Sequence, residues 1–166
     1  MALVVEDGTG LSTAESFISV ADAGTRRSNL GDNTAWDALT TTQKEQALRK
    51  ATEFMEQRFR NRWKGTKLLR DQALSWPRYG AEVDGYALES NYVPADIANA
   101  CADLALKSLT DTLNADLTRG IVREKVGPLE TEYDRYSPQS KRFVAVDQML
   151  ASYLKGSGIN ARLIVS

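Results

Sequence analysis

Histidine is absent from the 166-residue sequence, and there is a single cysteine, Cys101. The absence of histidine excludes Ser-His-Asp and Cys-His nucleophile systems, histidine general bases and histidine metal ligands. One cysteine permits neither an intrachain disulfide nor a thiolate zinc site, and it suits a reducing compartment. Paired carboxylates remain available for catalysis, but scattered Asp and Glu residues occur on any protein surface. We therefore expect no enzymatic activity, no metal and no cofactor.

Long apolar runs are missing too, since no stretch reaches the roughly 18 apolar residues that a membrane span needs. The first residues are acidic and their apolar run is short, so we expect no signal peptide and no membrane partner. The net charge is −1 and the pI is about 5.6, which does not suit a general nucleic-acid binder. Hydrophobic residues make up 42% of the chain and charged residues 26%, as in a globular protein of one domain.

Helical signals dominate what is present. Thr40 and Gln43 form a capping box, and behind it apolar residues recur at spacings of three and four, which predicts a helix over 41–59. Ser19 and Asp22 form a second box. Further helices are expected over 20–30 with Gly31 as its end, over one turn at 34–39, from Pro94 to about Gly120 with Leu109 on its buried face, and over 145–154.

Two short strands, 121–126 and 129–133, flank Gly127-Pro128 and predict a β-hairpin within 119–135. Residues 1–15 are predicted to form an N-terminal arm, and 156–166 a C-terminal arm. The sequence therefore predicts a mainly α fold in a single domain, 1–166. It is a small bundle of three to four helices with a protruding β-hairpin and extended terminal arms.

A basic run without acidic residues extends over 58–70, with Phe59 and Trp63 interleaved. Its cations are Arg58, Arg60, Arg62, Lys64, Lys67 and Arg70. Basic grooves with stacking aromatics hold single strands without reading their sequence. The same residues also suit a solvated helix end whose aromatics lie in the core. A third possibility is an acidic protein partner.

Two other features have structural interpretations. Trp76-Pro77-Arg78 places a bulky ring before proline, which predicts a rigid corner that fills the core. Cys101 lies on the apolar face of a predicted helix and is interpreted as core filler, because a reactive thiol needs a partly exposed, electropositive site. Gly8 and Gly10 do not form a phosphate loop, because the spacing of the glycines and the Gly-Lys-Ser/Thr end are missing.

Several stretches, in the same order along the chain, resemble one known family. They include Val-Glu-Asp-Gly-Thr-Gly at 5–10, Gln-Ala-Leu-Ser-Trp-Pro-Arg at 72–78 and Val-Arg-Glu-Lys-Val-Gly-Pro-Leu-Glu at 122–130; the others lie at 14–23, 35–39, 44–52, 62–65, 94–97 and 145–147. Together they resemble tailed-phage head–tail connector, or adaptor, proteins. Some members of that family are labelled DnaT-like single-stranded-DNA-binding proteins.

The resemblance implies a structural protein of the virion, located at the head–tail junction and in the host cytoplasm during assembly. It implies a homo-oligomeric ring of about twelve copies beneath the portal protein, on which tail or stopper proteins dock. DNA would pass through the ring without its sequence being read. Charged hairpin residues would then face the channel or the stopper, although solubility alone also explains them: Arg123, Glu124, Lys125, Glu130 and Glu132.

The C-terminal stretch is too apolar for a segment that stays in water. We interpret it as an arm that docks on the portal or on the next subunit, through Ile159, Arg162, Leu163, Ile164 and Val165. The alternative is that it folds back on its own domain. For the whole chain, the alternative function is that of a single-stranded-DNA-binding or primosome-like protein that uses the basic run at 58–70.

Overall fold

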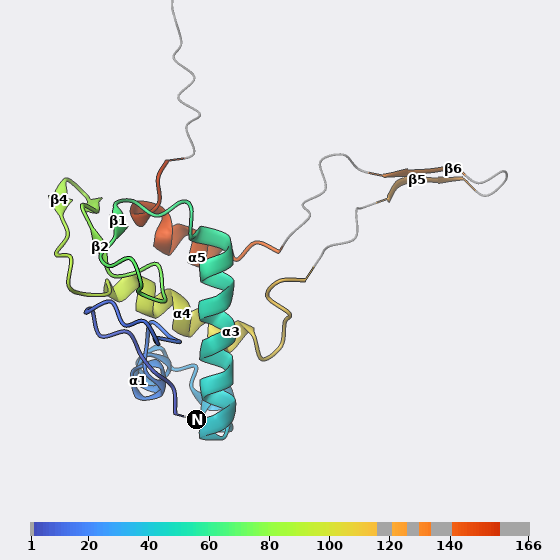
Figure 1. Cartoon of the computed structure of the whole chain (residues 1–166). Coiled ribbons are helices and arrows are strands. Elements are labelled where there is room, and N and C mark those ends of the chain that lie inside the picture. The colour runs from blue at the N-terminus through green and yellow to red at the C-terminus, as the bar shows by residue number, and fades with distance from the viewer. Residues whose placement is uncertain (1, 116–120, 126–129, 134–140, 157–166) are drawn as a thin grey trace, which may run out of the picture.

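The computed structural model describes residues 2–115, 121–125, 130–133 and 141–156 (Figure 1). Within the two strands at 121–125 and 130–133 the description covers the backbone. The described part is mainly helical. Its helices are α1 (Val20–Leu30), α2 (Thr34–Asp37), α3 (Thr41–Phe59), α4 (Ala95–Lys107) and α5 (Val144–Leu150), followed by a 3₁₀ turn at Ala151–Tyr153. The single turn of α2 brings these helices to five, one more than the three to four predicted.

Helix α3 has the predicted bounds because its start and its buried face are both encoded locally. The Thr40 side chain accepts from the Gln43 N–H, and the Gln43 side chain accepts from the Thr40 N–H, which completes the capping box. Its apolar face is buried as predicted and consists of Ala47, Leu48, Ala51, Met55 and Phe59 together with Phe54 and Thr52. This face packs against α4.

Helix α1 also begins and ends where predicted. Ser19 accepts a hydrogen bond from the Asp22 N–H, and Gly31 ends the helix with φ of 72°, a left-handed conformation that suits glycine. The Asp22 carboxylate accepts a hydrogen bond from the Ser19 hydroxyl and not from the Ser19 backbone N–H. The predicted return bond of this capping box, from the Ser19 N–H to Asp22, is therefore wrong.

Helix α4 is shorter than predicted. Pro94 is its N-cap instead of its first helical residue, and the helix ends at Lys107, well before Gly120. The Ser108 hydroxyl donates to the Ala105 carbonyl, an example of side chains that compete with helical backbone bonds. Leu109 lies beyond the helix end and is 37% exposed, so its predicted burial is wrong.

Helix α5 covers most of the predicted segment 145–154, but the chain then tightens into the 3₁₀ turn and straightens at Leu154. Aromatic rings join this turn to the rest of the core. The Tyr153 ring meets the Trp76 ring edge-on at 6.0 Å, and Trp76 meets Trp63 in the same way at the same separation. The Tyr153 hydroxyl donates to Asp96 on α4 at 2.9 Å.

Three small antiparallel sheets complete the described fold. They pair β1 (Thr66–Lys67) with β2 (Arg78–Tyr79), β3 (Glu82–Val83) with β4 (Tyr86–Ala87), and β5 (Ile121–Lys125) with β6 (Glu130–Tyr133). The last pair is the hairpin predicted around Gly127-Pro128, with Lys125 opposite Glu130. Figure 1 shows it standing apart from the helices.

The prediction of an N-terminal arm is wrong for the residues that the structure describes. Val5 forms a bridge with Ser16, and the Glu6 N–H donates to the Ser16 carbonyl at 2.9 Å, so the segment folds back on itself. Its side chains then pack on the body of the protein, and Ala14, Phe17 and Ile18 belong to the core. The predicted C-terminal arm lies outside the described residues, apart from its first residue.

The loop after Val5 is organised around one buried carboxylate. Glu6 is 4% exposed and accepts from the N–H groups of Gly8, Gly10 and Leu11 at 3.0, 2.8 and 2.9 Å. Gly8 has φ of 97°, and a Cβ there would lie 2.1 Å from the Asn91 carbonyl oxygen. The N–H groups that a phosphate loop would offer to a ligand are therefore bonded to the protein's own carboxylate.

Candidate nucleic-acid interface

The basic run begins in the last turn of α3, where its first cation is bound within the fold. The Arg58 guanidinium pairs with Asp147 of α5 at 3.2 Å and lies over the rings of Phe54 and Phe59, 5.8 and 5.6 Å from their centroids. Its side chain is 19% exposed. Arg58 therefore joins α3 to α5 and offers little charge to a ligand.

The two interleaved aromatics also belong to the core. Phe59 is 0% exposed and Trp63 is 1% exposed, with 5.6 Å between their ring centroids. A stacking groove built from Phe59 and Trp63 is therefore wrong, and the interpretation of these rings as core residues is correct. The remaining cations lie between and after these two rings, beyond the end of α3.

The segment after α3 is held by backbone pairing at both ends. At one end, Thr66 of β1 lies opposite Tyr79 of β2. At the other end, Trp63 forms an antiparallel bridge with Leu154, in which the Lys64 N–H donates to the Tyr153 carbonyl at 3.0 Å. The Lys155 N–H completes this bridge by donating to the Arg62 carbonyl at 2.7 Å. Residues 62–67 are thus paired at their start with residues 153–155 and at their end with β2, and a bend at Lys64 and Gly65 separates the two pairings.

Exposed side chains lie beside buried ones at both pairings. Trp63 and Leu154, which lie opposite each other, are both buried, as is Tyr153, whereas Arg62 and Lys155 are exposed and Lys64 is partly exposed. Thr66 and Tyr79, also opposite each other, are both exposed. We call the exposed and partly exposed residues at these pairings the basic face, and it consists of Arg62, Lys64, Thr66, Tyr79 and Lys155. It carries three positive charges and none of its members is acidic.

Arg78 fixes the backbone beneath the basic face. Its buried guanidinium donates to the carbonyls of Lys64, Gly65 and Ser75 at 2.6, 2.7 and 2.9 Å. Burial lowers the pKa of Arg78, and the nearby charge of Glu56 opposes this effect. Gly65 has φ of 68°, and a Cβ there would lie 2.4 Å from the Tyr79 carbonyl oxygen, so the strands approach as closely as glycine allows.

The corner at 76–78 lies under the same surface. Trp76 is 0% exposed, Pro77 is fully buried and Arg78 is 6% exposed. The predicted corner residues thus lie inside the protein, where they support the strand that ends in Tyr79.

The other predicted cations differ in their availability. The Lys67 ammonium donates to the Gln72 carbonyl at 2.9 Å. Burial lowers the pKa of Lys67; Glu56 opposes this, while the positive charges of Arg60 and Arg78 lower it further. Arg60 and Arg70 are exposed. Arg60 therefore contributes to the positive potential beside the basic face, whereas Lys67 braces a loop.

Cys101 is 0% exposed beneath α3, 3.3 Å from the Thr52 hydroxyl. Burial raises the pKa of its thiol, which keeps the sulfur protonated. Within the described ranges, no cluster of three or more His, Cys, Asp or Glu side chains could hold a metal ion. None of the helices in those ranges combines the length and apolar character that a membrane span needs.

A pocket of about 490 Å³ opens between α1, α4 and the start of α5, with Leu30 and Val144 on its rim. Three of the charged groups that line it, Arg27, Asp32 and Asp103, are paired with one another or with Arg26. Asp103 accepts from Arg26 at 2.8 and 3.0 Å and also from Arg27, whose side chain bonds Asp32 at 2.8 Å as well. This cluster fastens α1 to α4, and its charges are not available to a ligand.

Three residues of the basic face, Thr66, Tyr79 and Lys155, were not predicted from the sequence. Tyr79 follows the corner without any periodic signal, and Lys155 lies at the far end of the chain, so pairing alone brings them beside Lys64. The hairpin candidates at 123–125, 130 and 132 lie in β5 and β6, whose backbone alone is described. The docking-arm candidates at 159–165 lie outside the described residues.

The described residues therefore define a mainly helical domain that carries a preformed cationic surface. The model of the family described as “Putative DnaT-like ssDNA binding protein” matches residues 1–165, and the chain belongs to this family. No curated protein and no solved structure matches the chain.

Proposed function

We propose that this protein binds single-stranded DNA through the basic face and has no catalytic activity. The observation that carries the proposal is the pairing of Trp63 with Leu154, which brings Arg62, Lys64 and Lys155 together from two distant parts of the chain on a backbone braced by Arg78. The family description, which names single-stranded DNA as the ligand, supports the same choice.

Binding would rest on phosphate neutralisation. Each cation that meets a phosphate releases counterions from the strand, and this release does not depend on the base sequence. Because the net charge of the chain is −1, the rest of the surface adds no general attraction. Binding is therefore expected to be weak and non-specific at physiological salt and much tighter when salt is low. With three phosphate contacts, log K against log salt should have a slope of about −2.

Fluorescence anisotropy with a labelled oligo(dT) tests this proposal. Changing Arg62, Lys64 and Lys155 together to Glu should abolish binding at low salt. The matched control is Lys50→Glu, which makes the same change at an exposed position of α3. If Lys50→Glu and Lys64→Glu lower the affinity for oligo(dT) equally, overall charge and not the basic face governs binding.

A second candidate, a head–tail adaptor of a tailed phage, has one specific observation in its favour. The β5–β6 hairpin stands apart from the helices in Figure 1, as the predicted protruding hairpin of an adaptor should. In this proposal, copies form a ring beneath a portal protein in the virion, the hairpin faces the channel or the stopper, and DNA passes through unread. The C-terminal stretch at 159–165 would dock on the portal or on the next subunit.

Negative-stain electron microscopy of the purified chain, alone and mixed with a portal protein, separates the two candidates. The adaptor requires rings or portal-bound copies that persist when the basic face is changed to Glu. A protein that stays monomeric beside portal rings, yet binds oligo(dT), would leave single-strand binding as the function.

A further inference from the structure

We infer that Tyr79 is a base-stacking residue, the aromatic contact of the basic face that Phe59 and Trp63 cannot supply. The inference rests on the proposed single-strand binding and deepens it. Where cations hold the phosphates, a neighbouring exposed ring can stack on an unpaired base, and such stacking tolerates any base.

The first observation is the exposure of the ring. Tyr79 is 68% exposed, although the three residues before it, Trp76, Pro77 and Arg78, are buried. The chain thus turns outward at this position and leaves a large aromatic side chain in water. Tyr79 contributes little to the core, so its ring is free to bind.

The second observation is the position of the ring among cations. Tyr79 lies directly opposite Thr66, two residues from Lys64. The Lys64 ammonium is itself drawn toward the β2–β3 region, because it donates to the Glu82 carbonyl at 3.0 Å. A strand whose phosphates meet Lys64 and Arg62 would therefore bring its bases within reach of this ring.

The third observation is rigidity. Arg78, the residue before Tyr79, donates two hydrogen bonds from its side chain to the carbonyls of Lys64 and Gly65, at 2.6 and 2.7 Å. The Leu68 N–H donates to the Pro77 carbonyl at 3.3 Å, which adds a second tie between the strands. A ring on a fixed backbone loses little conformational freedom when it binds, and this favours a stable stack.

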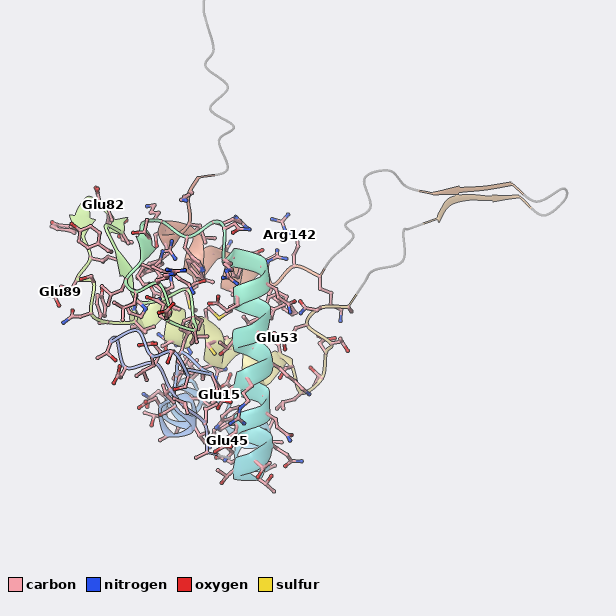
Figure 2. The ribbon with its side chains drawn as sticks, viewed as in Figure 1. Glu15, Glu45, Glu53, Glu82, Glu89 and Arg142 are labelled. Carbon is pink, nitrogen blue, oxygen red and sulfur yellow. The ribbon has the colours of Figure 1, made fainter. Side chains whose placement is uncertain are left out.

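Tyr86 shows why exposure alone is insufficient. It is 76% exposed, but it lies on β4 in a hairpin that also carries Glu82 and Asp84. Figure 2 shows Glu82 and Glu89 at this same edge of the molecule. From Tyr79 to the next cation, Lys107, the sequence contains no basic residue. Phosphates are repelled there, so Tyr86 is a natural control of nearly equal exposure.

The test compares Tyr79→Ala, Tyr79→Phe and Tyr86→Ala by anisotropy with oligo(dT) at low salt. Tyr79→Ala should weaken binding by between about 5-fold and 100-fold, the usual range for one lost stack. Tyr79→Phe should retain affinity, because its ring still stacks, and Tyr86→Ala should bind like the unaltered protein. The salt slope should be the same in all three variants, because no charge changes.

A duplex of the same length provides the second measurement. Its bases are already stacked on one another, so the unaltered protein should bind it more weakly than oligo(dT), and Tyr79→Ala should reduce this preference. If Tyr79→Ala binds oligo(dT) like the unaltered protein while Lys64→Glu does not bind, stacking is wrong and single-strand binding stands. If the unaltered protein binds neither nucleic acid, both proposals are overturned.

Discussion

Among single residues, the tryptophans show most clearly how the core supports the surface above it. Trp76 is 0% exposed and packs edge-on against both Trp63 and Tyr153. Among the described residues, neither its indole N–H nor that of Trp63 has a hydrogen-bond partner. Packing, not hydrogen bonding, therefore accounts for the contribution of these two rings.

Trp76→Ala should lower the free energy of unfolding by ~3–5 kcal/mol, because it leaves a large cavity between the rings of Trp63 and Tyr153. Equilibrium urea denaturation measures the change. Trp76→Phe keeps part of the ring and removes the unpaired N–H, so it should be less destabilising. A loss below about 1 kcal/mol for the alanine variant would mean that the ring is not buried in solution.

Cys101 should be unreactive in the native protein. Burial excludes reagents and raises the pKa of the thiol, so the reactive thiolate is scarce. An Ellman titration should therefore detect the thiol after unfolding in concentrated guanidinium chloride but not before. Rapid native labelling would show that α3 and α4 separate readily.

At the level of elements, α3 is specified almost entirely by its own sequence. Its capping box, its apolar spacing and its bounds were all predicted because each depends on residues within one or two turns. The predicted end of α4, at about Gly120, is wrong. A helix stops where side chains or tertiary contacts offer its backbone groups other hydrogen-bond partners, as the Ser108 hydroxyl does for the Ala105 carbonyl.

Thr40→Ala should destabilise the protein by about 1 kcal/mol, because the N–H of Gln43 loses its side-chain acceptor. Thr42→Ala, an exposed position inside the same helix, is the control. It should be neutral or slightly stabilising, because alanine is the better helix former. Thermal unfolding followed by circular dichroism compares the two. Equal effects of both changes would show that the capping box does not hold the helix start.

For the whole molecule, the last core residue in the described part of the chain is Leu154, and we expect no essential core contact beyond it. A chain ending at Gly156 should therefore fold with a free energy of unfolding within about 0.5 kcal/mol of the full chain. In the adaptor proposal, the same truncation should abolish portal binding. A truncated chain that unfolds would show that residues 157–166 fold back on their own domain.

The sequence by itself determined the features that local chemistry encodes. Without histidine or paired cysteines, it excluded the common nucleophile and zinc systems, and it predicted the main helices, the hairpin at Gly127-Pro128 and the basic run at 58–70. It left open whether Phe59 and Trp63 face solvent, because residues at a helix end suit a core or a groove equally well.

Only the tertiary structure decided which cations and which ring share a surface. Arg58 turned inward because Asp147 lies opposite it, and Lys155 joined Arg62 because Leu154 pairs with Trp63. The N-terminal segment folded back because the Glu6 carboxylate found three N–H donors in the glycine loop. These outcomes depend on which buried groups find partners across the fold, and spacing along the chain does not contain that information.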